Sequence, residues 1–242
     1  MRVAIIGSDV SALVLALRLS SIHTVTVIEQ EAEIGMPVHH PGRILDLNVL
    51  TTYIPKKHHG ILQLHDNGGE FGCRWEWVVK LLTIECATHG VRFETRSRVT
   101  SMTEQSGIHR LEFNHLRKEM HIDVDVVIDM NIVQDVGPGR RTHCLNADGL
   151  LAWGKPELAQ AKGILIPSNH LDLVSVSEPA FIIPRADHQT EIWWYGTSNE
   201  TSTHGVLERM HGYLPLNGRL VSFDGCVILA ERVLSGLEVE HI

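Results

Sequence analysis

The residues whose types and spacing could bind a ligand lie at the start of the chain. Gly7 interrupts a short apolar run, Arg2–Ile6, and the apolar residues that follow recur at helical spacing over Val10–Ser20. A second, β-branched run, Thr24–Ile28, ends at Glu29. This order predicts a strand, a tight turn, a helix and a second strand, which together make a βαβ unit. The helix N-terminus of such a unit points free backbone N–H groups toward the turn and favours an anion there.

The position of Glu29 fits a dinucleotide-binding unit. It follows Gly7 by 29 − 7 = 22 residues, and in such units an acid about 20 residues beyond the glycine turn accepts hydrogen bonds from the ribose. The glycine pattern G-x-G-x-x-G/A reads GSDVSA here, with Asp9 at the second glycine. Glycine there lets the backbone approach a pyrophosphate, so Asp9 adds bulk and negative charge and predicts weaker binding. A plain βαβ unit without a nucleotide is the alternative.

The segment after the second predicted strand extends the pattern. Residues 29–35 read EQEAEIG and residues 37–43 read PVHHPGR. This order resembles the two-dinucleotide-binding FAD oxidoreductases, close to the geranylgeranyl reductase, p-hydroxybenzoate hydroxylase and D-amino-acid oxidase branches, where a loop with Gly and Arg runs toward the flavin. The resemblance implies FAD as cofactor and Arg43 among its contacts. It also makes His39 and His40 candidate catalytic residues.

A second segment resembles the same families. Apolar spacing predicts an amphipathic helix from Arg74 to His89, and a strand follows over 91–93. In those families an Arg or Asp precedes such a helix, and the next strand leads to a Val whose backbone meets the adenine. The resemblance implies that Arg74 lies near the FAD phosphates or ribityl chain and that Val99 is the adenine contact. The alternative for Arg74 is an exposed residue at a helix start.

Two further stretches belong to the predicted core. Residues 124–130 form a near-continuous apolar run, as expected of a parallel strand buried on both faces. Residues 221–237 suggest a strand, an Asp224-Gly225 turn and a C-terminal helix, which resembles the second flavin-contacting element of the family. The resemblance implies that Asp224 and Gly225 contact the cofactor. The alternative is an ordinary terminal helix with Asp224 as its N-cap.

Residues 174–204 belong to the predicted substrate region, and residues 205–214 begin the last segment of the predicted core. Two antiparallel strands are predicted, over 174–185 and 191–195, and a short helix over 206–214. The phrase FIIPR followed by WYGT resembles a hairpin that lines the substrate sheet in the amino-acid oxidase branch, so Arg185 and Tyr195 become candidate catalytic residues.

The chemistry of this segment leaves two readings open. Alternation along a strand puts Trp193 and Tyr195 on one face and Trp194 on the other. The paired donors of Arg185 suit a carboxylate. The alternative is that the three aromatic residues are core and Arg185 is a surface residue.

Composition excludes several classes of protein. The chain has 242 residues, 43% of them hydrophobic, and a formal net charge of −8, which gives nucleic-acid binding no electrostatic support. No apolar run has transmembrane length. Four scattered cysteines form no C-x-x-C pair, which argues against a redox dithiol and a zinc ribbon. A reduced, cytoplasmic location is the default expectation. The 16 histidines show no ligand spacing, and no metal site is predicted.

We therefore expect an α/β fold with an FAD-type Rossmann core and a small antiparallel substrate region. The core would comprise about 1–50, 70–135 and 205–242, and the substrate region about 51–69 and 136–204. The expected cofactor-binding residues are Gly7, Ser8, Val10, Ser11, Ala12, Glu29, Gln30, Arg43, Arg74, Val99, Asp224 and Gly225. The predicted function is an FAD-dependent oxidoreductase acting on a small organic substrate. The alternatives are a non-catalytic nucleotide- or flavin-binding protein and an NAD(P)-dependent reductase.

Overall fold

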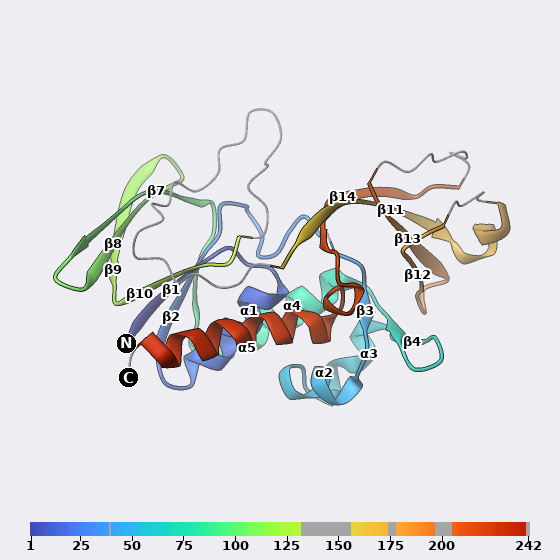
Figure 1. Ribbon diagram of the computed structural model, residues 1–242, viewed down its shortest axis with the longest axis horizontal. Helices are drawn as coiled ribbons and strands as arrows, with labels where there is room; N and C mark the ends of the chain where they lie inside the picture. The colour runs from blue at the N-terminus through green and yellow to red at the C-terminus, as the bar shows by residue number, and fades with distance from the viewer. Residues whose placement is uncertain (39, 132–155, 174–177, 197–204, 241–242) are drawn as a thin grey trace. The chain divides into compact units, whose positions relative to one another are not determined.

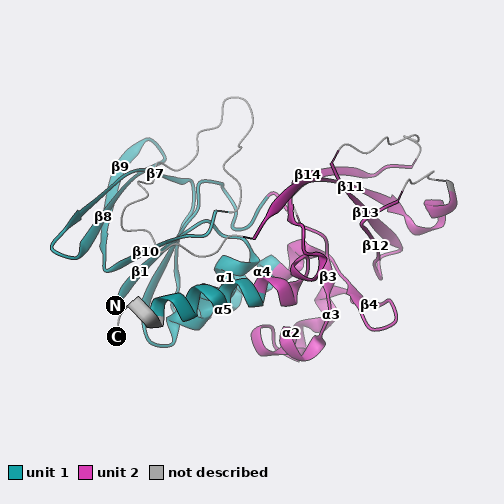
Figure 2. Cartoon of the chain, viewed as in Figure 1, with its two compact units in different colours: residues 1–36, 79–155, 227–242 teal, residues 37–78, 156–226 magenta. Residues whose placement is uncertain are grey.

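The computed structural model describes residues 1–38, 40–131, 156–173, 178–196 and 205–240. The chain divides into two compact units (Figure 2). Unit 1 comprises residues 1–36, 79–155 and 227–242, and unit 2 comprises residues 37–78 and 156–226.

A four-stranded parallel sheet forms the centre of unit 1 (Figure 1). Its strands, in spatial order, are β10 (Val126–Asp129), β1 (Arg2–Ile6), β2 (Thr24–Ile28) and β6 (Arg92–Glu94). The predicted βαβ unit and the predicted parallel strand within 124–130 are both confirmed. All of β1 after its first residue is buried, which explains its unbroken apolar run.

Helices and a second sheet pack against this parallel sheet. Helix α1 (Val10–Ser20) contacts β1 and β2. Helix α5 (Phe223–Glu240) runs beside α1 over its unit 1 residues, where Arg18 pairs with Glu231 at 3.1 Å (Figure 1). The unit 1 part of α4 (Trp75–Thr88) reaches α1 through Cys86, whose thiol donates to the Leu13 carbonyl.

An antiparallel meander covers part of the parallel sheet. Its strands are β7 (Ser97–Gln105), β8 (Ile108–His115) and β9 (Lys118–Val124), in that spatial order. Alternate residues of β1, including Ala4 and Ile6, share a buried cluster with Val99, Leu111 and Phe113 from the meander. The meander therefore completes the hydrophobic core of unit 1.

Unit 2 is built on a four-stranded antiparallel sheet. Its spatial order is β12 (Phe181–Pro184), β13 (Gln189–Tyr195), β11 (Leu158–Pro167) and β14 (Glu208–Pro215). Trp193 is fully buried in a cluster on one face, and Tyr195 packs against that cluster. Trp194 belongs to a separate cluster. The predicted alternation of these three aromatic residues is confirmed.

The rest of unit 2 consists of short elements. A small sheet has the order β3 (Arg43–Ile44), β5 (Phe71–Gly72) and β4 (His65–Asp66). Helices α2 (Leu47–Tyr53) and α3 (His59–Leu62) lie between β3 and β4 in the chain. Single 3-10 turns span Lys56–His58, Ser168–Leu173 and Gly218–Leu220.

Two local predictions were wrong. The helix expected over 206–214 is strand β14, because pairing with β11 from Leu158 to Leu165 outweighs the local helical spacing. No strand and Asp-Gly turn precede α5, which begins at Phe223 and contains Asp224 and Gly225 in its first turn. Ser222 accounts for this start, because its hydroxyl accepts the Gly225 N–H at 3.0 Å and so caps the helix.

One strand glycine makes a test of this packing. Gly163 on β11 lies directly opposite Trp193, and a Cβ there would lie 2.7 Å from the indole ring. Gly163→Ala should therefore lower the free energy of unfolding by about 1–3 kcal/mol, the usual cost of overpacking. Urea unfolding followed by tryptophan fluorescence measures it. Gly60→Ala is the matched control, since a Cβ at Gly60 meets nothing within 4 Å. Equal midpoints for the two variants would contradict this account.

Candidate functional site

The turn after β1 depends on Gly7. Its φ is +95°, in the left-handed region, and a Cβ at this position would lie 2.9 Å from Oδ1 of Asn131. Its N–H donates to the Ile28 carbonyl at 3.0 Å, which ties the turn to the end of β2. A side chain is therefore excluded at the place where a dinucleotide-binding unit needs a tight turn.

Glu29 lies beside this turn and is held by hydrogen bonds within unit 1. Its Oε2 accepts the Ser8 hydroxyl at 2.6 Å, and its Oε1 accepts the Glu31 N–H at 2.9 Å. The Ser8 hydroxyl in turn accepts the Gly35 N–H at 2.7 Å. Burial raises the pKa of Glu29, and the Ser8 and Glu31 bonds oppose that rise. Each carboxylate oxygen accepts more than one bond, so capacity remains for ribose hydroxyls.

Asp9 occupies the N-terminus of α1. It is the N-cap residue, in extended conformation, and its Oδ1 accepts the Ala12 N–H at 2.8 Å. Burial raises the pKa of Asp9 to about 7, and the nearby Glu29 contributes to the rise. The carboxyl group thus takes one of the amides that a dinucleotide-binding turn offers to a phosphate.

The remaining predicted unit 1 residues divide between the turn and the core. Ser11 is fully buried, and its hydroxyl has no hydrogen-bond partner among the described residues. The Oε1 of Gln30 is also buried without such a partner. Val10 and Ala12 are buried apolar residues of α1, and the side chain of Val99 lies in the core of the meander. Its backbone pairs with Phe113 on β8 beside a bulge.

The turn was tested for its fit to an adenine dinucleotide. The left-handed glycine, Glu29 at the strand end and the Ser11 hydroxyl, which has no partner within the described ranges, all fit. The helix N-terminus does not fit a second anion while Asp9 carries a charge, because Asp9 already holds the Ala12 amide. The ribose end of the turn is therefore suited to the group, and the phosphate end depends on the state of Asp9.

Arg43 is engaged within unit 2. Its Nε donates to Oε2 of Glu70 at 2.8 Å and its Nη1 donates to the Gly218 carbonyl at 2.9 Å. The guanidinium also lies 5.3 Å from the centroid of the Phe181 ring. Phe181 contacts Tyr195 edge-on at 6.2 Å between ring centroids. Arg43 and Tyr195, which were predicted separately, are thus brought to the same aromatic side chain.

Tyr195 and Arg74 have partners of different kinds. The Tyr195 hydroxyl donates to the Pro215 carbonyl at 2.6 Å, and burial raises the pKa of this phenol. Arg74 lies just before α4 with its guanidinium 6.0 Å from the Trp77 ring, and its Nε is buried without a hydrogen-bond partner among the described residues.

His40 is held in one protonation state. Its ring stacks on Trp75 with centroids 4.4 Å apart and an interplanar angle of 19°. Its Nδ1 donates to the Pro41 carbonyl at 2.8 Å, because a carbonyl oxygen can only accept. Burial lowers the pKa of His40 to about 4. The imidazole is therefore neutral at pH 7 with Nε2 as an acceptor. His39 lies outside the described residues.

Asp224 and Gly225 support the local structure of unit 2. Oδ2 of Asp224 accepts the Leu45 N–H at 2.7 Å and so joins the first turn of α5 to the segment after β3. A Cβ at Gly225 would lie 2.3 Å from the Leu220 carbonyl oxygen. Close backbone packing therefore explains why a glycine stands in this helix.

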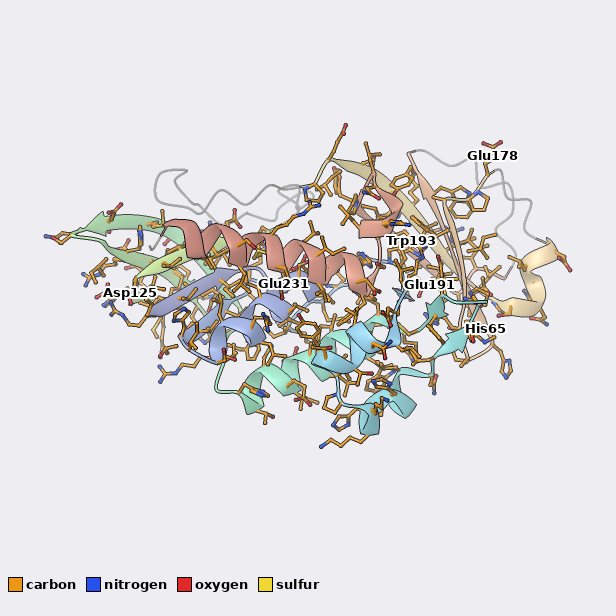
Figure 3. The ribbon with its side chains drawn as sticks, turned by 60° about the horizontal axis from the view of Figure 1, so that its bottom comes forward. His65, Asp125, Glu178, Glu191, Trp193 and Glu231 are labelled. Atoms are coloured by element: carbon orange, nitrogen blue, oxygen red, sulfur yellow. The ribbon has the colours of Figure 1, made fainter. Side chains whose placement is uncertain are left out.

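Sequence reasoning missed the buried acid Glu191. Its Oε1 accepts Nη1 of Arg185 at 3.0 Å, while its Oε2 accepts the Gly42 N–H and the indole N–H of Trp193, each at 3.1 Å. Figure 3 labels Glu191 and Trp193 of this cluster. Burial raises the pKa of Glu191, and its partners oppose this rise. The available signal was an acid at the start of the apolar run IWWY, where a charge without a partner would be costly.

Arg185 completes this buried cluster. It is 6% exposed, so the alternative of a surface residue was wrong. Besides Glu191, its guanidinium donates to Asp187 at 2.6 Å and to Gln189 at 3.2 Å. A substrate carboxylate would have to displace these partners, since they already use the paired geometry for which Arg is suited.

Solved structures of flavoproteins share this fold. A flavoprotein/dehydrogenase from Cytophaga hutchinsonii matches at a TM-score of 0.60 and 12% identity, over 100% of this chain and 80% of that one. A geranylgeranyl bacteriochlorophyll reductase-like protein from Thermoplasma acidophilum matches at 0.61 and 12%, over 97% and 75%. The L-α-glycerophosphate oxidase of Mycoplasma pneumoniae, solved with FAD bound, matches at 0.61 and 11%, over 98% and 94%.

Other comparisons limit what this likeness shows. The chain spans 54% of the Diels-Alderase PyrE3 of pyrroindomycin biosynthesis, at a TM-score of 0.53 and 11% identity. No protein-family model and no curated protein sequence matches the chain. The α/β fold with a parallel core and antiparallel sheets, as expected from the sequence, is confirmed.

The described ranges contain neither a metal-ligand cluster nor a membrane-spanning helix. No group of three or more potential ligands from His, Cys, Asp and Glu comes together there. None of the helices described is both long and apolar enough to cross a membrane. Cys73, Cys86 and Cys226 are buried and form no disulfide within the described residues, and Cys144 lies outside them.

The buried cluster around Arg185 makes a prediction about stability. Arg185→Ala should lower the free energy of unfolding by about 3–5 kcal/mol, because it leaves the Glu191 charge buried without its cation. Urea unfolding at pH 7 measures the loss. Arg110→Ala is the control, since Arg110 makes an exposed pair with Asp123 at 2.7 Å and should have little effect. Similar losses in the two variants would show that the cluster contributes no more than a surface pair.

Proposed function

We propose that the protein is an FAD-dependent oxidoreductase that acts on a small organic substrate. The observation that carries the proposal is the Gly7 turn with Glu29 at the end of β2, set in a fold shared with an FAD-bound oxidase over 98% of this chain. A bound flavin would supply the redox chemistry, while the protein supplies binding, orientation and electrostatics.

The residues of the first turn have distinct proposed roles. Glu29 would accept hydrogen bonds from the adenosine ribose, and Gly7 would keep the backbone open to the cofactor. Ser11 would gain a partner for its hydroxyl, which is buried and unpaired within the described chain. Gln30, with its unpaired buried oxygen, would serve in the same way. The other predicted contacts, including Arg43, Arg74 and Val99, stay predictions.

His40 is the stronger of the proposed acid–base residues. Its Nε2 is an acceptor at neutral pH, because Nδ1 carries the proton that is bonded to Pro41. It would therefore accept a hydrogen bond from a substrate hydroxyl or amine, while its lowered pKa makes it a weak base at neutral pH. Tyr195 would act as a hydrogen-bond acceptor, since its hydroxyl proton is donated to the Pro215 carbonyl and burial keeps the phenol neutral. His39 and Arg185 stay candidates from the sequence.

The second candidate function is a flavin- or nucleotide-binding protein without catalysis. The observation that favours it is a departure from the glycine pattern, because Asp9 replaces the second glycine and its carboxyl group holds the Ala12 amide. The visible spectrum of the purified protein, before and after denaturation, tests flavin binding. Anaerobic reduction by amino acids, amines, hydroxy acids and NAD(P)H then tests catalysis. Flavin that is bound but bleached by no donor would favour the second candidate, and a colourless protein with no thermal shift in excess FAD would refute the first.

The role of Glu29 gives a sharper prediction. Glu29→Gln should weaken FAD binding at least about tenfold, because charge-assisted bonds to hydroxyls contribute roughly 1.5–3 kcal/mol each. Quenching of flavin fluorescence during titration measures the dissociation constant. Glu33→Gln is the matched control, since Glu33 lies in the same loop and is exposed. An unchanged dissociation constant in Glu29→Gln would mean that Glu29 only supports the turn through Ser8.

A further inference from the structure

The N-terminus of α1 already holds an anionic group from the protein itself. Oδ1 of Asp9 lies 2.8 Å from the Ala12 nitrogen, in the geometry of a helix N-cap. Helix N-termini bind phosphates through these first-turn amides and the positive end of the helix dipole. A phosphate bound there and an ionised Asp9 would compete for the same donors and repel each other.

The groups around Asp9 do not relieve that repulsion. The charged group that acts on Asp9 is Glu29, another acid, which faces the turn from the end of β2. Glu31, in the loop that follows, raises the pKa of Glu29 in turn. Asp129 at the end of β10 is bonded to Asn131, whose side chain lies against Gly7. Glu29 is thus the charged group that acts directly on Asp9, and its charge has the same sign.

Protonation changes what Asp9 can do. A neutral carboxyl group has an O–H that donates, so it can bond to a phosphate oxygen instead of opposing it. Ser11 in the same helical turn offers a second hydroxyl, which is fully buried and has no partner among the described residues. Neutral Asp9 and Ser11 together would give the phosphate end of the turn the donors that it otherwise lacks.

We propose that Asp9 makes cofactor binding proton-linked, so that the pyrophosphate binds at the N-terminus of α1 only with the Asp9 carboxyl protonated and binding takes up one proton from solvent. The proposal rests on the proposed function, since it assumes an FAD-type dinucleotide on this turn. Burial raises the pKa of Asp9 to about 7, which puts the exchange of this proton near neutral pH. Asp9 becomes a phosphate-binding residue in its neutral form.

The affinity for FAD should therefore depend on pH in one direction. Above about pH 7 Asp9 is ionised in the free protein, so each further pH unit should weaken FAD binding, approaching tenfold per unit. Below that pH the affinity should level off. His40 contributes no titration in this range, because its pKa lies at about 4.

Asp9→Asn separates this mechanism from others. Asn keeps the shape and the N-cap acceptor but carries no charge, so the variant should bind FAD tightly with no dependence on pH from 6 to 8.5. Asp46→Asn is the matched control. Asp46 caps α2 through the Asn48 N–H at 2.7 Å and is exposed, so that variant should keep the pH dependence of the wild type. Fluorescence titration with FAD itself measures all three proteins.

Urea unfolding without cofactor tests the ionisation of Asp9 independently. A carboxyl group whose pKa is raised in the folded state binds more protons folded than unfolded, so its ionisation lowers stability as pH rises between the two pKa values. The urea midpoint of the wild type should therefore fall, relative to that of Asp9→Asn, from about pH 4 to about pH 7. If the urea midpoints of the wild type and of Asp9→Asn changed equally with pH over this range, Asp9 would ionise normally. That result would overturn the proposal.

The binding outcomes distinguish the two proposals. FAD binding that is equally tight at every pH in the wild type would overturn the proton link and leave the proposed function standing. If the affinity of Asp9→Asn for FAD changed with pH as steeply as that of the wild type, the proton link would also be overturned. Another group would then be responsible for the pH dependence. No binding of FAD by either protein at any pH would refute the proposed function and the proton link together.

Discussion

The hydrogen bond from Ser8 to Glu29 holds the first turn to the end of the second parallel strand. Ser8 also accepts the Gly35 N–H, so one buried hydroxyl joins the turn, the strand end and the loop that leaves it. Gly7 makes the arrangement possible, because a side chain there would collide with Asn131. The turn is therefore defined by close contacts and internal hydrogen bonds before any ligand binds, which is the preorganisation that a binding site requires.

The sequence was most informative where local spacing and buried pairing agree. The β1, α1 and β2 elements follow directly from apolar runs and the glycine that breaks them, and the alternation of the three β13 aromatics followed from strand geometry. Strand β14 was missed because its identity depends on pairing with β11, which is distant in sequence. The start of α5 was missed because Ser222, rather than the Asp-Gly pair, caps it.

Side-chain partners were harder to predict than elements. The sequence singled out Arg185 as a donor for carboxylates, and the structure shows such pairing, but with Asp187 and Glu191 of the same unit. Glu191 gave only a weak signal, because the sequence alone does not show which cation pairs with an acid next to IWWY. Asp9 was recognised as a departure from the glycine pattern, yet its bond to Ala12 depends on a rotamer that no pattern encodes.

Glu191 and Asp9, two acids whose pKa is raised, show how carboxyl groups can serve different ends. Glu191 has a guanidinium, an indole N–H and a backbone N–H as partners. These partners belong to the protein itself and offset the free-energy cost of burying the carboxylate charge. Asp9 has a backbone amide and an acidic neighbour, so its charge is opposed rather than matched. Strongly shifted carboxyl groups of this second kind gather at functional sites, because a structural role alone is served better by a paired or neutral residue. That contrast, within one chain, is why the Asp9 turn is the place where ligand chemistry should be sought.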